Sequence, residues 1–161
     1  MPREPDLVSS GLWLDVGLGI GASLWIDGEE AALWKPVSLS LNIGYELDPT
    51  LAIIVRGSSW LKTDGSANEF LGAGVAYRFL EERMYVAGAL GASLTRTGPI
   101  SDWQHHVQGL ALVADVAQAF PLTAITQLAV GAHFQIGTPL LGDDESFTSI
   151  AAGIFIAFGV R

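Results

Sequence analysis

Apolar and polar residues alternate along most of this chain with a period of two. From Leu12 to Leu24 the even positions hold Leu, Val, Ile or Ala, whereas the odd positions between them hold Gly, Ser, Asp or Trp. Because successive side chains of a β-strand point to opposite faces, this pattern predicts strands. The alternation recurs in eight stretches, residues 12–25, 34–45, 51–61, 71–79, 84–95, 109–120, 127–136 and 149–160.

The two faces of these predicted strands differ in the same way in every stretch. One face carries Leu, Ile, Val and aromatic residues, and the other carries mostly Gly, Ala and Ser with occasional charges. A soluble barrel would place large apolar residues inside and polar ones in water, and a β-sandwich would give some strands a charged outer face. Neither fits, so we predict an all-β, eight-stranded antiparallel up-and-down transmembrane β-barrel with its apolar face outward.

The predicted connections alternate in length along the chain. They fall near residues 26–32, 46–49, 62–69, 80–83, 96–106, 121–123 and 138–146, in the order long, short, long, short, long, short, long. Bacterial barrels have short periplasmic turns and longer outer loops. We therefore expect both termini in the periplasm, residues 1–10 as a periplasmic tail, residues 11–161 as the barrel, and the acidic segments 27–30 and 142–145 outside.

Aromatic residues end the strands that descend to the expected periplasmic rim. Such residues form the girdles by which barrels sit in the membrane interface. The predicted interface aromatics are Tyr45, Tyr77, Phe79, Phe120 and Phe158.

Composition narrows the function further. Half of the 161 residues are hydrophobic, the net charge is −9, and there is no cysteine. A negative chain lacks the electrostatic grip on phosphates that nucleic-acid binding needs, and the absence of thiols removes disulfides and cysteine chemistry. The first residues lack an apolar signal segment, so an exported protein would be represented here by its mature form. We expect no cofactor and no resident metal.

Strand number, alternation, loop pattern and rim aromatics together give a resemblance. The chain resembles the small outer-membrane barrels of the OmpA, OmpX and OmpW type over about residues 11 to 160. The resemblance implies an integral protein of the bacterial outer membrane, in contact with outer-membrane lipid and lipopolysaccharide, and monomeric. Many such barrels end in Phe, whereas here Phe158 is followed by three further residues.

Polar residues on the inward face form the first candidate site. Unpaired charges would be costly inside a barrel, so we expect two acids and two arginines to pair across the lumen, completed by amides and a phenol. A structural network is the first interpretation, and a narrow pore or proton path is the alternative. The predicted lumen network comprises Asp15, Arg56, Arg78, Asp115, Asn42, Gln127 and Tyr85.

Glycines and large aromatics share the same inward face. Inward glycines let strands bend sharply, which is the simpler interpretation. A second interpretation is an unfilled lumen that holds an acyl chain or small ligand beneath an aromatic lid. The predicted lid comprises Trp25, Trp34, Trp60 and Phe70.

One enzymatic possibility rests on a histidine late in the chain. His133 followed by Glu145 is similar to the catalytic arrangement of PagL-type lipid A deacylases, which use a His-x-Ser motif and a downstream acid. Here Gln135 stands where that nucleophilic Ser would be, and the alternation turns His133 inward. We therefore expect a non-enzymatic structural or interaction barrel, which contacts lipopolysaccharide or a protein partner through its outer loops.

Two features of the predicted outer loops are weaker candidates. The acidic residues 143–145 could bridge a divalent cation to lipopolysaccharide, although neighbouring acids in a loop are usually only solvated. His105 and His106 lack an evident third ligand for a metal.

Overall fold

The computed structural model describes residues 11–27, 30–79, 83–97, 104–139 and 148–160 of the chain. No helix in these residues is long and apolar enough to cross a membrane. The strands are β1 (Leu12–Asp27), β2 (Glu30–Trp34), β3 (Val37–Glu46), β4 (Leu51–Leu61), β5 (Ala67–Phe79), β6 (Met84–Thr97), β7 (Gln104–Pro121), β8 (Thr126–Pro139) and β9 (Thr148–Val160).

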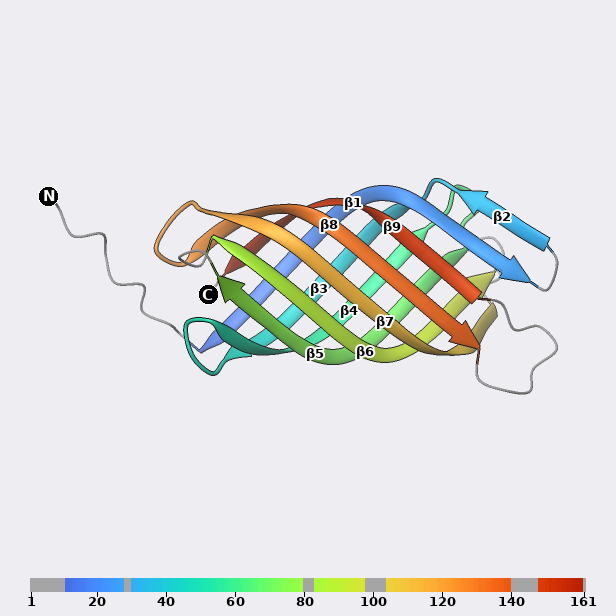
Figure 1. Ribbon diagram of the computed structural model, residues 1–161. Helices are drawn as coiled ribbons and strands as arrows, with labels where there is room; N and C mark the ends of the chain where they lie inside the picture. Colours follow the sequence, from blue (N-terminus) through green and yellow to red (C-terminus); the bar gives the residue numbers. More distant parts are fainter. Residues whose placement is uncertain (1–10, 28–29, 80–82, 98–103, 140–147, 161) are drawn as a thin grey trace, which may run out of the picture.

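The strands form one closed antiparallel sheet (Figure 1). Each strand from β4 onward pairs with the strand before it in sequence, and β9 pairs with β1 to close the barrel. β2 and β3 pair with the same edge of β1 in one continuous register, since Ser23 lies opposite Trp34 and Ile20 opposite Val37. Pro36, which has no N–H to donate, interrupts what is otherwise one strand. The predicted eight-stranded antiparallel barrel is confirmed.

The stagger of the sheet sets the tilt of its strands. Following the pairing once around the barrel from Leu14 leads back to β1 at Leu24, ten residues further along. In an eight-stranded barrel such a stagger tilts the strands by roughly 40°. On β5 the outward residues from Phe79 to Leu71 are apolar, and Glu69 is the first outward charge. The ten residue steps from Phe79 to Glu69, at about 3.3 Å each and tilted in this way, place this first outward charge roughly 25 Å from Phe79 along the barrel axis, which is the height of a membrane barrel's apolar band.

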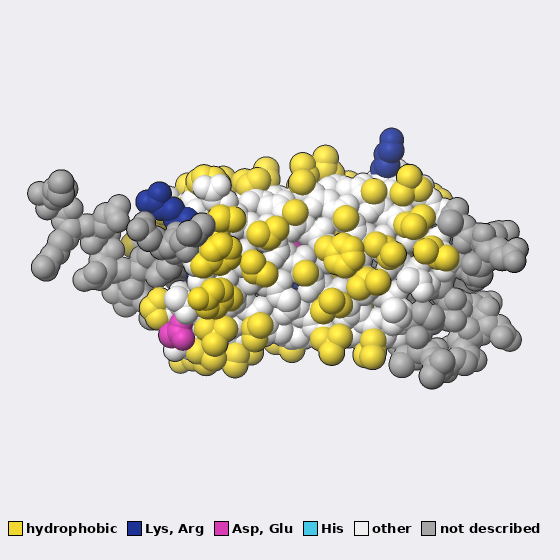
Figure 2. All heavy atoms as spheres, viewed as in Figure 1, with side chains coloured by type: hydrophobic (Ala, Val, Ile, Leu, Met, Phe, Trp, Pro, Cys, Tyr) yellow, Lys and Arg dark blue, Asp and Glu magenta, His cyan; other side chains and the backbone are white. Residues whose placement is uncertain are grey.

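The apolar face points outward, as the alternation predicted. Ile154 on β9 is 64% exposed, whereas its neighbour Phe155 is 6% exposed and lies in the lumen. Hydrophobic side chains cover the visible flank of the barrel, and the charged groups on that flank lie toward its two ends (Figure 2). A face of this kind is unfavourable in water and favourable in lipid.

We call the end of the barrel that holds the first residue of β1 and the last of β9 the terminal end, and the opposite end the distal end (Figure 1). β3 is joined to β4, β5 to β6 and β7 to β8 at the terminal end, and β1 is joined to β2, β4 to β5, β6 to β7 and β8 to β9 at the distal end. The connections predicted at 26–32 and 96–106 include residues that belong to strands. β1, β2, β6 and β7 continue past the apolar band as paired strands. The turn expected at 62–69 is also shorter, since β5 already begins at Ala67.

Glycines allow the wall to bend sharply at two opposite seams. A Cβ on Gly74 would lie 1.8 Å from the carbonyl oxygen of Gly88 across the β5–β6 seam, and one on Gly21 would lie 2.2 Å from the carbonyl of Ala152 across the β1–β9 seam. The order of strands places these two seams on opposite sides of the barrel. Gly109 has a positive φ of 145° beside the β-bulge in the β6–β7 pairing, where a side chain would be strained. The inward glycines named here therefore serve the curvature of the wall.

Candidate functional site in the barrel lumen

The lumen contains polar side chains at successive heights, which we describe from the terminal end. In the terminal layer Arg78 Nη1 lies 2.5 Å from Glu46 Oε1, and both side chains are buried. The Arg78 guanidinium also lies over the ring of Trp13, 4.9 Å from its centroid, and Trp13 packs edge-to-face on Tyr85. Ion pair and aromatic packing together fill the first level of the lumen.

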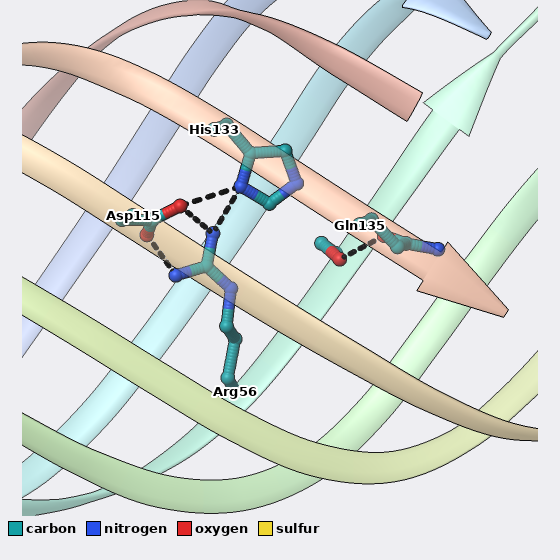
Figure 3. Close-up of polar contacts among 5 residues, drawn as sticks. Arg56, Asp115, His133 and Gln135 are labelled. Atoms are coloured by element: carbon teal, nitrogen blue, oxygen red, sulfur yellow. Dashed lines mark hydrogen bonds and ion pairs between the residues drawn. The ribbon is translucent and has the colours of Figure 1, made fainter. Parts of the chain in front are cut away.

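The middle layer is an ionic cluster that crosses the barrel. Arg56 extends from β4 to Asp115 on β7 and His133 on β8, on the other side of the lumen (Figure 3). Arg56 Nη1 donates to Asp115 Oδ2, while Nη2 lies 3.2 Å from Oδ1 of the same carboxylate and 2.9 Å from His133 Nδ1. We call these three residues the middle layer.

His133 is held on the same carboxylate as Arg56. Asp115 and His133 lie directly opposite each other on paired strands, and His133 Nδ1 is 2.6 Å from Asp115 Oδ1. On its other side the imidazole packs against Trp60, with 5.2 Å between ring centroids. Since the carboxylate accepts from both Arg56 and His133, all three side chains are fixed in orientation. In the described part of the chain no hydroxyl is hydrogen-bonded to His133.

The distal layer consists of neutral groups. Ser58 Oγ donates to Gln135 Oε1 at 3.0 Å, and Gln135 Nε2 donates to Asn68 Oδ1 at 3.2 Å. Gln135 is labelled in Figure 3. Ser93 Oγ donates to the same Asn68 oxygen at 3.3 Å. These four residues come from β4, β8, β5 and β6, so the distal layer also spans the lumen, but without formal charge.

At the distal mouth Lys62 lies between two indoles. Its Nζ contacts the ring of Trp25 at 2.7 Å from the centroid and that of Trp34 at 4.4 Å. Burial lowers the pKa of Lys62 to about 8, while the indole faces favour its charged form. Lys62 therefore stays largely cationic at neutral pH.

The structure places every predicted lumen residue inside the barrel, in three separate groupings. Arg56 and Asp115 meet in the middle layer, whereas Arg78 binds Glu46, a partner that was not predicted. Asp15 and Gln127 lie near one another beside Gly159, and Asn42 lies opposite both Asp15 and Arg56 in the strand pairing. The predicted lumen network is thus a stack of layers and not one cluster.

The predicted aromatic lid also divides. Trp60 packs on His133 in the interior, Trp25 and Trp34 hold Lys62 at the distal mouth, and Phe70 belongs to an apolar cluster with Val113. These four residues therefore lie in three environments and do not form a single cover over an empty lumen.

The remaining predicted residues lie on the outer surface or outside the described residues. Tyr77 and Phe79 stack with 6.4 Å between centroids, and Tyr45, Phe120 and Phe158 are exposed on the apolar face near the terminal end. Glu145, the acid predicted to assist His133, the acidic cluster 143–145 and the tail 1–10 lie outside the described residues. The side chains of His105 and His106 do as well.

Sequence reasoning missed Glu46, Lys62, Ser58 and Asn68. Glu46 has the same parity as Asn42 and Gly44, and Lys62 the same parity as Ser58 and Trp60, so continuing the alternation would have turned both inward. Both residues fall within the connections predicted at 46–49 and 62–69.

Comparison with solved structures gives the fold a context. The chain is similar to neisserial surface protein A (TM-score 0.67, 13% identity, 92% of this chain and 96% of that one). It is also similar to the attachment invasion locus protein Ail of Yersinia pestis, in complex with the heparin analogue sucrose octasulfate (0.57, 12%, 92% and 98%). A third similar structure is the N-terminal β-barrel domain of Pseudomonas aeruginosa OprF (0.51, 12%, 90% and 96%).

At these identities the likeness concerns the fold alone, which is that of small outer-membrane barrels of the OmpA and OmpX type. No family model matches the sequence, and no curated protein matches it.

Proposed function

We propose that the protein is an integral barrel of the bacterial outer membrane that serves as a closed, non-enzymatic anchor and not as a pore. The observation that carries this proposal is the middle layer, in which Arg56 crosses the lumen to Asp115 and His133. An eight-stranded barrel has an interior just wide enough for side chains, so a fixed guanidinium between opposite walls closes it. Trp13 and Tyr85 in the terminal layer add to the closure.

The membrane assignment rests on the outward face. An apolar band of roughly 25 Å matches the outer membrane, and the aromatic residues at the terminal end fit an interfacial girdle. The short connections at the terminal end fit the periplasmic side of such barrels. We therefore place both termini in the periplasm and the distal end outside, with the outer-membrane lipid and lipopolysaccharide around a monomer.

The acidic outer segments favour particular contacts. Residues 27–30 and 142–145 hold six acidic residues and no basic ones, which favours cationic partners or divalent-cation bridges to lipopolysaccharide. The Ail structure contains a heparin analogue, which is a polyanion. Because of its acidic segments, we do not extend that ligand to the loops of this protein.

Planar-bilayer conductance tests the closed lumen. We expect no discrete current steps from the purified wild-type protein at loads where a porin conducts. The double variant R56S/D115S shortens both sides of the middle layer and should give a measurable current, while K35S, which alters an exposed outward residue, should stay silent. Discrete wild-type steps would overturn the proposal in favour of a narrow pore.

A lipid-handling activity is the alternative from another class. It is disfavoured by the burial of His133 and by its engagement with Asp115 and Arg56, since an imidazole in this position cannot reach a lipid on the outer face. Incubating purified protein with lipid A and examining the product by mass spectrometry separates the two. If lipid A lost an acyl chain with the wild-type protein but not with a His133 variant, the protein would be a deacylase and not an anchor.

A further inference from the structure

Several buried polar groups in the distal part of the lumen have no hydrogen-bond partner among the described residues. They include Trp34 Nε1, Trp60 Nε1, Asn68 Nδ2 and Ser149 Oγ, each enclosed by the protein. All four are donors, the serine hydroxyl being an acceptor as well. Buried donors without a partner are costly and are satisfied by water or by a bound group, and donors of this kind also occur deeper in the lumen, for example Arg56 Nε and Trp13 Nε1.

A buried cation lies at the entrance to these donors. Lys62 is only 8% exposed, and no carboxylate lies within ion-pairing distance of its ammonium among the side chains that the structure describes, which do not include those of Asp27 and Glu30. Asp64 acts on it only through space, because the Asp64 carboxylate already accepts from Ser66 N and Oγ. The faces of Trp25 and Trp34 hold the ammonium but offer no negative charge.

Two of these donors lie on, or in register with, the residues that contact Lys62. Trp34, whose ring lies on Lys62, carries one of the unpartnered N–H groups. Ser149 lies directly opposite Trp25 in the β1–β9 pairing, and Trp25 contacts Lys62 with its ring. Lys62, which follows β4, thus brings positive charge, and Trp34 on β2 and Ser149 on β9 bring an N–H and an O–H donor, to the distal part of the lumen. Complementary chemistry is negative, with several acceptor oxygens.

We propose that the distal mouth of the lumen binds a small oxyanion, a carboxylate or a phosphate or sulfate group, between the Lys62 ammonium, Trp34 Nε1 and Ser149 Oγ. The site goes beyond the proposed anchor role and does not depend on it, because the middle layer lies deeper in the barrel. The net charge of −9 opposes anions at long range, but salt at about 0.1 M limits that repulsion to about 10 Å. The acidic segments 27–30 and 142–145 follow in sequence at this end, so the Lys62 ammonium and the two donors must outweigh the repulsion of acids that lie within that distance.

Indole N–H resonances provide the test. The wild-type protein, folded in an uncharged detergent with ¹⁵N-labelled tryptophan, is titrated with sodium sulfate and separately with sodium acetate, with ionic strength held constant by sodium chloride. We expect a saturable shift of the Trp34 Nε1–H resonance. Trp13, in the terminal layer, is the internal control and should not move.

Matched variants assign the site. K62M keeps the length of the side chain but removes its charge, and should weaken sulfate binding at least tenfold. K35M removes an exposed, outward lysine and should leave binding unchanged. Heat-dependent gel mobility of each variant shows that it is folded, and the wild-type titration stands by itself if K62M does not fold.

A second arm identifies the source of the anion. The titration is repeated with micelles that contain phosphatidylglycerol in place of free sulfate. Saturation with free sulfate or acetate identifies a dissolved anion, and saturation only with the lipid identifies a headgroup. Shifts that stay linear in both arms, or that persist unchanged in K62M, would show that the protein supplies the counter-charge itself and would overturn the proposal.

Discussion

The terminal and middle layers of the lumen are built from ions in pairs, whereas the distal layer is built from amides and hydroxyls. Arg78 with Glu46 and Arg56 with Asp115 neutralise each other inside the barrel. Asn68 and Gln135 share neutral hydrogen bonds, and several nearby donors have no partner in the described residues. The comparison indicates that ion pairs hold the terminal and middle layers and neutral hydrogen bonds hold the distal layer, while buried polar groups without a partner among the described residues occur in all three.

The difference between the charged and the neutral layers should be largest when one partner of a buried ion pair is removed. D115A leaves the Arg56 guanidinium buried without its carboxylate, so we expect a loss of about 3–5 kcal/mol in the free energy of unfolding. The double variant R56M/D115L removes both charges and should lose far less. Denaturant unfolding in detergent, followed by tryptophan fluorescence, measures both. Equal losses in the single and double variants would mean that the ion pair is not the stabilising feature.

A single substitution at the β5–β6 seam should destabilise the barrel wall without changing the polar layers inside it. G74A places a Cβ against the carbonyl of Gly88 across the β5–β6 seam, and overpacking of this kind should cost about 1–3 kcal/mol. G88A is the matched control, because its Cβ would point outward, with its nearest contact the Val113 carbonyl oxygen at an ordinary 3.9 Å. The same unfolding measurement should find G88A neutral or slightly stabilising. A reversed order would contradict the bent seam.

The distal layer should tolerate substitution better than the middle layer. Q135L removes the donor to Asn68 and the acceptor of Ser58, but Asn68 keeps its bond from Ser93. We expect a loss of about 1 kcal/mol, typical of a neutral buried hydrogen bond. If Q135L were as damaging as D115A, the contrast between the layers would not hold.

The smallest effect is expected outside the lumen, in the turn before β4. The Asp48 carboxylate accepts hydrogen bonds from Thr50 N, Thr50 Oγ1 and Leu51 N, which lowers its pKa below the ordinary value of 3.8. A carboxyl with a lowered pKa contributes stability above its unfolded pKa and loses it as the pH falls through the folded value. Relative to D48N, the wild type should therefore lose stability as the pH falls below the ordinary value of 3.8. If the difference in stability between the wild type and D48N did not change with pH, the hydrogen bonds to the Asp48 carboxylate would not contribute to stability.

The sequence predicts the barrel well because the alternation is local. In each stretch from Leu12 onward, the alternation indicates which residues face outward. Eight stretches with the same apolar face favour a closed sheet. The inward direction of Arg56 and Asp115 follows from the same parity. The alternation does not predict which inward side chains meet across the lumen, because that depends on the stagger between neighbouring strands, summed around the barrel.

The missed residues show the same limit of local reasoning. Glu46 and Lys62 lie at strand ends, where a charged residue is equally typical of a strand and of a turn. The pairing of Glu46 with Ala52 keeps Glu46 in the strand, and the packing of Lys62 on Trp25 keeps Lys62 inside the barrel. The hairpin of β1 and β2 was also read as a loop, because residues 26–32 lose the strict alternation just where Asp27 and Glu30 still pair.

The membrane barrel with an outward apolar band is the central claim, and heat-modifiability tests it most directly. The purified chain is folded into detergent, its far-UV circular dichroism is recorded, and its gel mobility is compared before and after boiling. We predict a β-rich spectrum and a mobility that changes on boiling, because a closed barrel resists detergent until it is heated. Good solubility in plain buffer, with no change in mobility on boiling, would contradict the outward apolar face and the lumen assignment built on it.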